Sequence, residues 1–149
     1  MKIQHEAYEI DDSRSRIDFV RVHSWLTSSY WSPGITEEKV QCAAAGSSLV
    51  IGAYLPSDNE NDGGVQAGYM RVISDKATFA WICDVFVDEA HRGQKIASAM
   101  VNFALAHPEH QGLRRWALAT RDAHPVYAGV GFIPLPEPAR WMIHYPEST

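Results

Sequence analysis

The sequence predicts an α/β fold in which helices flank a mixed, mostly antiparallel central sheet. Three apolar runs rich in β-branched and aromatic residues follow one another between residues 48 and 87, with turn formers between them, which is typical of an antiparallel meander. The last run passes through a short polar turn into an amphipathic helical pattern that starts at Arg92. A length of 149 residues, without a repeat or linker, suits one domain over residues 1–149.

The N-terminal third is expected to be mainly helical. The elements predicted there are a short edge strand at 6–11, a helix through Leu26 that Ser13 or Ser15 caps, and a helix from Thr36 to about Ala45 that Gly46 ends. In the first helix, apolar residues recur every three or four positions, so that one face is apolar. Pro33 and Gly34 separate the two helices because both residues interrupt regular structure.

The middle and the C-terminal part alternate strands and helices. The predicted elements are a strand at 48–55, a loop at 56–64, a strand at 66–74, a tight turn at Asp75–Lys76, a strand at 78–87, a helix from Arg92 to His107, a strand at 116–120, a helix from Asp122 through Tyr127 that stops at Gly129 or Gly131, and strands at 132–135 and 140–145. Pro108 disfavours helical backbone at His107 and therefore marks that helix end.

Composition narrows the classes of function. A formal net charge of −5 argues against nucleic acid as the main partner, since phosphate binding favours a basic surface. Cys42 and Cys83 are too few for a disulfide framework or a zinc site, and His107 and His110 lack a third ligand. We expect no metal. No apolar run reaches membrane-spanning length, so a cytoplasmic location is the default expectation.

The turn before the helix at Arg92 is the first candidate site. A helix N-terminus presents unpaired N–H groups and a positive dipole, which favour phosphate. The run Val85-x-Val87 followed by His91-Arg92-Gly93-x-x-Ile96-Ala97 resembles the acyl-CoA-binding motif of the GNAT family of N-acetyltransferases. Tyr127-Ala-Gly-Val-Gly131-Phe132 resembles the family's Tyr-x-x-x-Gly-Phe signature, and the predicted order of elements is similar to that of the family.

The resemblance implies a cofactor site for acetyl-CoA. The cofactor-binding residues that we expect are Val85, Phe86 and Val87 for the pantetheine arm and Arg92, Gly93, Gln94, Lys95, Ile96 and Ala97 for the pyrophosphate. The ordinary alternative is a strand–helix connection with a helpful glycine. Lys95 departs from the family pattern because it stands where a glycine is usual. Its ammonium either contacts the phosphates or is a solvated surface group.

Tyr127 is the expected catalytic acid. In similar enzymes the tyrosine of this signature protonates the departing CoA thiolate, and the alternative is a core aromatic with a surface hydroxyl. Asp84, in the strand beside the expected acyl site, is the candidate general base. An acid inside an apolar strand is costly unless it is paired or functional. The equal alternative is therefore a structural aspartate that pairs with Arg71 or Arg121.

The resemblance implies an acceptor site near Tyr30 and Trp31, which stand between the first two predicted helices in the sequence. His124 is a further substrate-binding candidate. The resulting hypothesis is an N-acetyltransferase that acts on a primary amine of a small molecule or amino-acid-like acceptor by direct attack in a ternary complex. The alternatives are a peptide or protein N-acetyltransferase and a non-catalytic acyl-CoA-binding regulatory module. A homodimer, formed through exposed edge strands and the late aromatic residues, is a further hypothesis.

Overall fold

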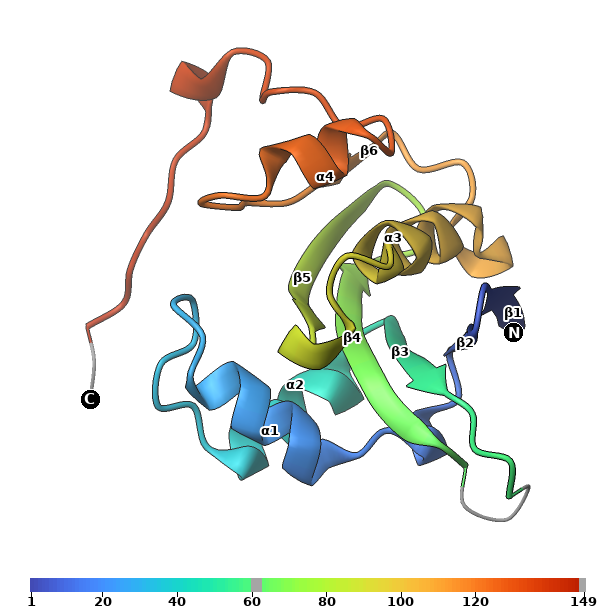
Figure 1. Cartoon of the computed structure of the whole chain (residues 1–149). Helices are drawn as coiled ribbons and strands as arrows, with labels where there is room; N and C mark the ends of the chain where they lie inside the picture. The colour runs from blue at the N-terminus through green and yellow to red at the C-terminus, as the bar shows by residue number, and fades with distance from the viewer. Residues whose placement is uncertain (60–62, 148–149) are drawn as a thin grey trace.

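The computed structural model describes residues 1–59 and 63–147 and contains one six-stranded sheet whose strands lie in sequence order (Figure 1). The strands are β1 (Lys2–His5), β2 (Tyr8–Asp11), β3 (Leu49–Leu55), β4 (Val65–Ser74), β5 (Phe79–Val87) and β6 (Arg115–Ala117). Neighbouring strands are antiparallel except β5 and β6, which are parallel. The prediction of a mixed, mostly antiparallel sheet is confirmed.

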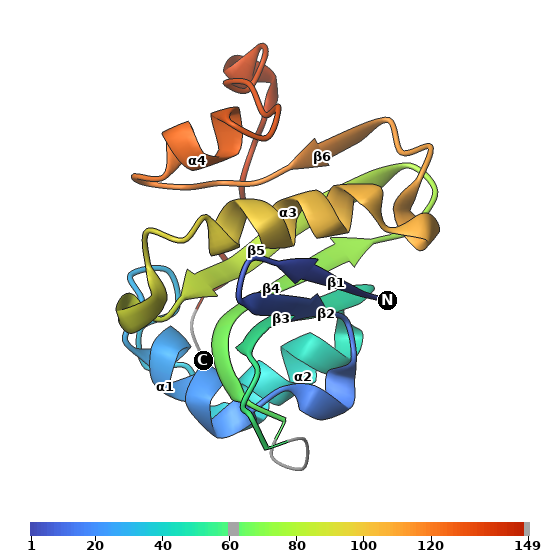
Figure 2. The same ribbon diagram turned by 45° about the vertical axis from the view of Figure 1, so that its right-hand side comes forward.

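Helices cover both faces of the sheet (Figure 2). They are α1 (Phe19–Thr27), α2 (Glu37–Gly46), α3 (Ile96–Ala106) and the short α4 (His124–Ala128). One core lies between the sheet and α3, and a second lies between the sheet and the α1–α2 pair. A Cβ at Gly68 of β4 would come within 3.1 Å of Met100 and 3.3 Å of Ile96. The absence of a side chain at Gly68 therefore lets the start of α3 lie close to the sheet.

Strand β5 contains a bulge at Asp84. Tyr69 pairs with Phe86 and Arg71 pairs with Cys83, so Asp84 and Val85 together lie opposite the single residue between them on β4. Asp84 takes up the extra length with a left-handed backbone, at φ 56°. Such a bulge bends a strand and redirects its side chains.

The N-terminal prediction needs two corrections. Residues 8–11 are a strand, but β1 pairs with its outer side, so this strand does not form the edge that we predicted. Neither Ser13 nor Ser15 caps α1. A 3₁₀ turn occupies residues 14–16, and Asp18 caps the helix by accepting the backbone N–H of Arg21. The cap of α2 by Thr36 is confirmed, because its hydroxyl accepts the N–H of Lys39.

The middle of the chain follows the prediction. The strands of the meander and the turn at Asp75–Lys76 are present, and Oδ1 of Asp75 accepts three backbone N–H groups that close this turn. The predicted loop at 56–64 lies partly outside the described residues. None of the helices in the described part of the chain combines the length and apolar character that crossing a bilayer requires.

The C-terminal prediction was wrong in part. Helix α3 begins at Ile96 rather than at Arg92, and strand β6 is shorter than predicted. The hydroxyl of Thr120, not Asp122, accepts the backbone N–H of Ala123 just before α4. Residues 132–135 and 140–145 form no strand. A strand needs a hydrogen-bonding neighbour, and in this chain the segment after Phe132 runs away from the sheet (Figure 1).

Candidate active site

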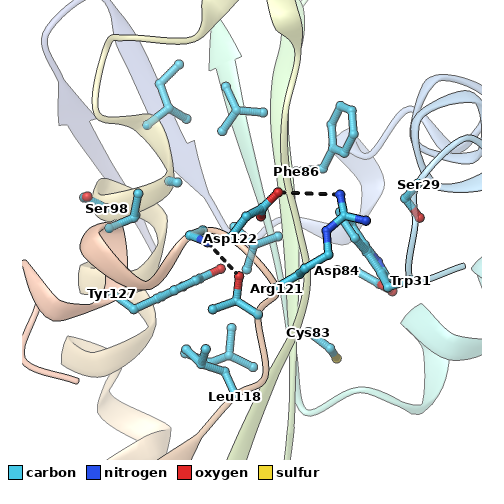
Figure 3. Close-up of a pocket in the computed structure, with 18 of the residues that line it drawn as sticks. Ser29, Trp31, Cys83, Asp84, Phe86, Ser98, Leu118, Arg121, Asp122 and Tyr127 are labelled. Atoms are coloured by element: carbon cyan, nitrogen blue, oxygen red, sulfur yellow. Dashed lines mark hydrogen bonds and ion pairs between the residues drawn. The ribbon is translucent and has the colours of Figure 1, made fainter. Parts of the chain in front are cut away.

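A cleft of about 1090 Å³ lies between β5, the turn that leads into α3, the loop after α1 and the segment after β6 (Figure 3). Most of the predicted site residues line it, namely Tyr30, Trp31, Asp84, Val85, Phe86, Val87, Arg92, Gly93, Lys95, Ile96, Ala97 and Tyr127. Gln94 and His124 do not. The structure therefore brings the cofactor, acid and acceptor candidates together around one cavity.

The part of β5 that faces the cleft has a free edge. β6 pairs only with Phe79, Ala80 and Trp81, so the edge of β5 from Ile82 onward has no strand partner on that side among the described residues. The pairing of the two parallel strands ends at Trp81, three residues before the bulge at Asp84. An open strand edge of this kind suits main-chain hydrogen bonds with an extended ligand.

The turn before α3 presents a row of unpartnered amides. The backbone N–H groups of residues 93–98 have no hydrogen-bond acceptor among the described residues. Gly93 and Lys95 both have left-handed backbones, at φ 84° and 59°. These two residues turn the chain from β5 into the helix. Such a row of donors at a helix N-terminus suits a phosphate group.

Side chains hold this turn in place from several directions. Nε of Arg92 donates to the carbonyl of Val87 at 3.1 Å, and its guanidinium lies 5.6 Å from the ring centre of Phe86. The Tyr8 hydroxyl and Nδ1 of His91 are 2.8 Å apart. Nε2 of His5 hydrogen-bonds the carbonyl of Gln94, at 2.8 Å, so the side of Gln94 away from the cleft is tied to β1.

Tyr127 extends from α4 into the cleft opposite Trp31 (Figure 3). Its ring packs edge-on against Phe132, and its hydroxyl has no hydrogen-bond partner among the residues that the structure describes. Burial, and to a smaller extent the neighbouring Tyr30, raises the pKa of Tyr127 to about 12. The phenol therefore keeps its proton at neutral pH and can donate it to a group in the cleft.

Asp84 is a buried carboxylate whose two oxygens are both engaged. Oδ2 accepts from Nε of Arg71 at 2.7 Å, and Oδ1 accepts from the indole N–H of Trp31 at 2.9 Å. Of the two partners considered for a structural aspartate, Arg71 is the actual one. Arg121 instead lies over the ring of Tyr30, 3.9 Å from its centre. This geometry favours the structural alternative for Asp84.

The acceptor side of the cleft is aromatic. The rings of Tyr30 and Trp31 meet edge-on with centres 5.0 Å apart, and Trp31 also lies 6.4 Å from Phe86. The Tyr30 hydroxyl accepts the backbone N–H of Arg121, at 3.0 Å, which joins the loop after α1 to the segment after β6. His124 is exposed and lines a different hollow, between β6, α4 and the C-terminal segment.

The cleft wall also includes residues that the sequence argument did not place in the site, among them Cys83, Arg121 and Asp122. The thiol of Cys83 donates to the carbonyl of Arg71, at 3.7 Å, and burial raises its pKa to about 11. Arg121 and Asp122 form an ion pair at 3.6 Å (Figure 3). Arg121 and Asp122 follow β6, the strand parallel to β5, and this position in the sequence is the signal that could have predicted their place in the cleft.

No group of three or more potential metal ligands occurs among the described residues. The two histidines with ligand-like spacing have other contacts. Nε2 of His107 lies 2.8 Å from Oδ2 of Asp12, and Nε2 of His110 lies 2.9 Å from the Ser48 hydroxyl.

The cleft, the open strand edge and the motif residues can be compared with known proteins. The profile of the Acetyltransferase (GNAT) family matches residues 8–132, which is most of the chain. The chain belongs to the GNAT acetyltransferase family. Acetyl transfer is the chemistry of this family.

Solved structures agree with this assignment. A protein from Xanthomonas campestris pv. campestris assigned to the GNAT acetyltransferase family is 38% identical, with a TM-score of 0.85 over 96% of each chain. A glucosamine-6-phosphate N-acetyltransferase from Arabidopsis thaliana is 17% identical, with a TM-score of 0.63 over 95% of this chain and 100% of that one. The second likeness shows the GNAT fold alone. Comparison with curated proteins gives no match.

Proposed function

We propose that this GNAT-family chain, as one domain over residues 1–149, transfers an acetyl group from acetyl-CoA to a primary amine of a small molecule or amino-acid-like acceptor. The observation that carries the proposal is the convergence on one cleft of the unpartnered amides of residues 93–98, the open edge of β5 and the free hydroxyl of Tyr127. Acetyl-CoA supplies an activated acyl group as a thioester, so no metal enters the reaction that we propose.

The two ends of the cofactor would have separate anchors. We assign the pyrophosphate to the amides between Gly93 and Ala97 and the pantetheine arm to the backbone of Val85, Phe86 and Val87. Gln94 would contribute its backbone N–H, which has no acceptor among the described residues, while its backbone carbonyl bonds His5. This arrangement would direct the acyl end toward Tyr127 and the aromatic side of the cleft.

Tyr127 is the general acid in this proposal. The acceptor's amine nitrogen forms a bond to the acyl carbon, the carbon–sulfur bond breaks, and the Tyr127 hydroxyl gives its proton to the departing sulfur. The position of the free hydroxyl in the cleft supports that role, and the phenol is protonated at neutral pH as the role requires. Water is the acceptor of the amine's proton that we favour, because both oxygens of Asp84 already accept hydrogen bonds.

Direct attack is favoured over an acyl-enzyme. Cys83 is the thiol in the cleft wall, and burial raises its pKa to about 11. The thiolate, not the thiol, is the nucleophile in acyl transfer to cysteine. Cys83 is therefore poorly suited to accept the acetyl group, and a ternary complex in which amine and thioester meet directly is the simpler route.

The acceptor that we propose is a small amine with apolar or aromatic surface. Tyr30, Trp31 and Phe86 provide the aromatic contacts, and such rings attract a cationic amine as well as a flat apolar group. His124 would contact an acceptor only if the acceptor reached past Tyr127, because His124 lines the neighbouring hollow and not this cleft. The cytoplasmic location expected from the sequence stays a prediction.

Two measurements test the proposal. Excess acetyl-CoA, at about 100 times its dissociation constant, should stabilise the fold by about 2.7 kcal/mol, which corresponds to a rise in Tm of roughly 5–10 °C. CoA release should then be followed with panels of amino acids, polyamines, arylalkylamines and aminosugars. The absence of a Tm shift at saturating acetyl-CoA would contradict the cofactor site.

The variant Tyr127→Phe separates the enzyme from a non-catalytic acyl-CoA-binding module. We expect kcat to fall by roughly 10²–10⁴-fold, the usual contribution of a general acid, while the acetyl-CoA dissociation constant stays unchanged. Tyr145→Phe is the matched control because that phenol is exposed and lies outside the cleft. Undiminished turnover of Tyr127→Phe across the whole pH range would remove Tyr127 from the mechanism.

A further inference from the structure

The hairpin of β1 and β2 lies beside α3 at the edge of the sheet (Figure 2). His5 and Tyr8 are paired across this hairpin, so their side chains lie on the same face of the sheet. Both side chains contact the segment between β5 and α3. Tyr8 bonds His91 and His5 bonds Gln94. Two neighbouring side chains of the hairpin therefore hold this segment at two separate points.

The bond between His5 and Gln94 has a defined direction. Nε2 of His5 lies 2.8 Å from the carbonyl oxygen of Gln94. A carbonyl oxygen is only an acceptor, so Nε2 carries the proton of this bond. The two residues are 89 positions apart in the chain. The bond is therefore a tertiary contact that β1 adds to the turn, and not a part of the turn itself.

The peptide group that contains the Gln94 carbonyl also contains the backbone N–H of Lys95. This peptide bond is trans, and in a planar trans peptide the C=O and the N–H point in opposite directions. Because the carbonyl is directed at His5 of β1, the N–H points to the other side, where Lys95 lines the cleft. This N–H has no acceptor among the described residues. His5 thus sets the direction of one of the donors before α3.

The start of α3 lacks the support that the other long helices have. Asp18 and Thr36 cap α1 and α2 with side-chain hydrogen bonds. At α3 the N-cap residue is Lys95, whose side chain makes no capping bond and whose backbone is left-handed, at φ 59°. That conformation is costly for a residue other than glycine. The bond from His5 therefore holds the peptide just before the helix, where a side-chain cap is missing.

We propose that His5 is a positioning residue for the pyrophosphate of acetyl-CoA, an inference that rests on the proposed function. His5 does not line the cleft, so it acts through the turn. Its bond to Gln94 aims the Lys95 N–H at the phosphate before the ligand binds, which lowers the cost of binding. Linked hydrogen bonds also polarise one another, so a donor on the carbonyl strengthens the N–H of the same peptide. Tyr8 keeps the hairpin against this segment.

Calorimetric titration of the full chain with acetyl-CoA tests this role. His5→Met, which lacks the donor, should bind acetyl-CoA roughly two- to tenfold more weakly than wild type, the effect of one hydrogen bond. His5→Gln, whose side-chain amide can donate in place of Nε2, should bind as tightly as wild type. S-acetylpantetheine has no pyrophosphate, so it should bind all three proteins equally. Gln4→Met is the matched control, because it removes a bond from Gln4 to the Glu6 carbonyl within the hairpin, and its affinity for acetyl-CoA should be that of wild type.

The carbonyl carbon NMR signal of Gln94 gives a second readout that needs no ligand. It should shift in His5→Met, which loses the hydrogen bond, and stay near its wild-type position in His5→Gln and Gln4→Met. An unshifted signal in His5→Met, unchanged acetyl-CoA affinity of that variant, or an equal loss of S-acetylpantetheine affinity would each overturn the role of His5 alone. Wild type that binds no acetyl-CoA would instead refute the proposed function, and this role of His5 with it.

Discussion

Lys95 is the residue whose replacement tests most directly how the turn before α3 is built. Its backbone is left-handed, at φ 59° and ψ 30°, a conformation that costs a non-glycine residue roughly 1–2 kcal/mol. Glycine removes that strain, but its larger loss of backbone entropy on folding lowers the free energy of unfolding by about 0.5–1 kcal/mol relative to alanine. We therefore expect Lys95→Gly to be more stable than Lys95→Ala by about 1 kcal/mol.

Urea unfolding of the two variants measures this difference. Both variants lack the ammonium, so the comparison isolates the backbone. In thermal unfolding, the glycine variant should have a Tm roughly 2–4 °C above that of the alanine variant. Equal stabilities would refute the reasoning, since they would mean that the turn relaxes without a left-handed residue at this position.

The same pair of variants decides what the Lys95 side chain does. It is exposed, and its ammonium makes no hydrogen bond or ion pair with a described residue. We therefore expect both variants to bind acetyl-CoA about as tightly as wild type in a calorimetric titration. An equal loss of affinity in both variants would instead show that the ammonium contacts the phosphates.

Two further predictions concern buried groups. Cys83→Ala should keep turnover, because burial raises the pKa of this thiol to about 11 and the thiol is not the acyl acceptor. Double-reciprocal plots of initial rate at several amine concentrations should then intersect. Parallel plots, together with an inactive variant, would indicate an acyl-enzyme. Burial also raises the pKa values of Tyr54 and Tyr69 in the folded protein. Above about pH 10 these two phenols therefore lose their protons more readily in the unfolded chain than in the folded one. The free energy of unfolding should then fall as pH rises, by up to about 1.4 kcal/mol per pH unit for each tyrosine. Urea titrations at several alkaline pH values should show a shallower fall for Tyr69→Phe, and identical slopes would contradict this account.

The sequence predicted the sheet and the cofactor turn because those signals are local. Apolar runs between turn formers mark β3, β4 and β5, and the hydroxyl of Thr36 caps α2 as its position suggests. The start of α3 was placed four residues too early because lysine gives no sign of a left-handed backbone. Only the structure shows that Lys95 lies just before the helix.

The C-terminal segment, residues 133–147, shows where local signals stop being sufficient. Its residues have strand propensity, yet a strand exists only where a second strand supplies hydrogen bonds. Whether residues 140–145 find one depends on the three prolines before them and on the molecules around them. The prolines can be read from the sequence, but the neighbouring strand is a tertiary or quaternary fact. A prediction from a single sequence weighs propensity and has no means to weigh the missing partner.

Asp84 shows why two readings of one residue remained open until the structure was known. Its position in an apolar strand beside the acyl site is equally consistent with a base and with a buried structural acid. The structure adds that its backbone is left-handed, which aspartate tolerates better than most residues. The bulge therefore accounts for the residue type without any catalytic role. The carboxylate in turn holds Arg71 and Trp31, so one residue both forms the bulge in β5 and fixes Trp31 on the acceptor side of the cleft.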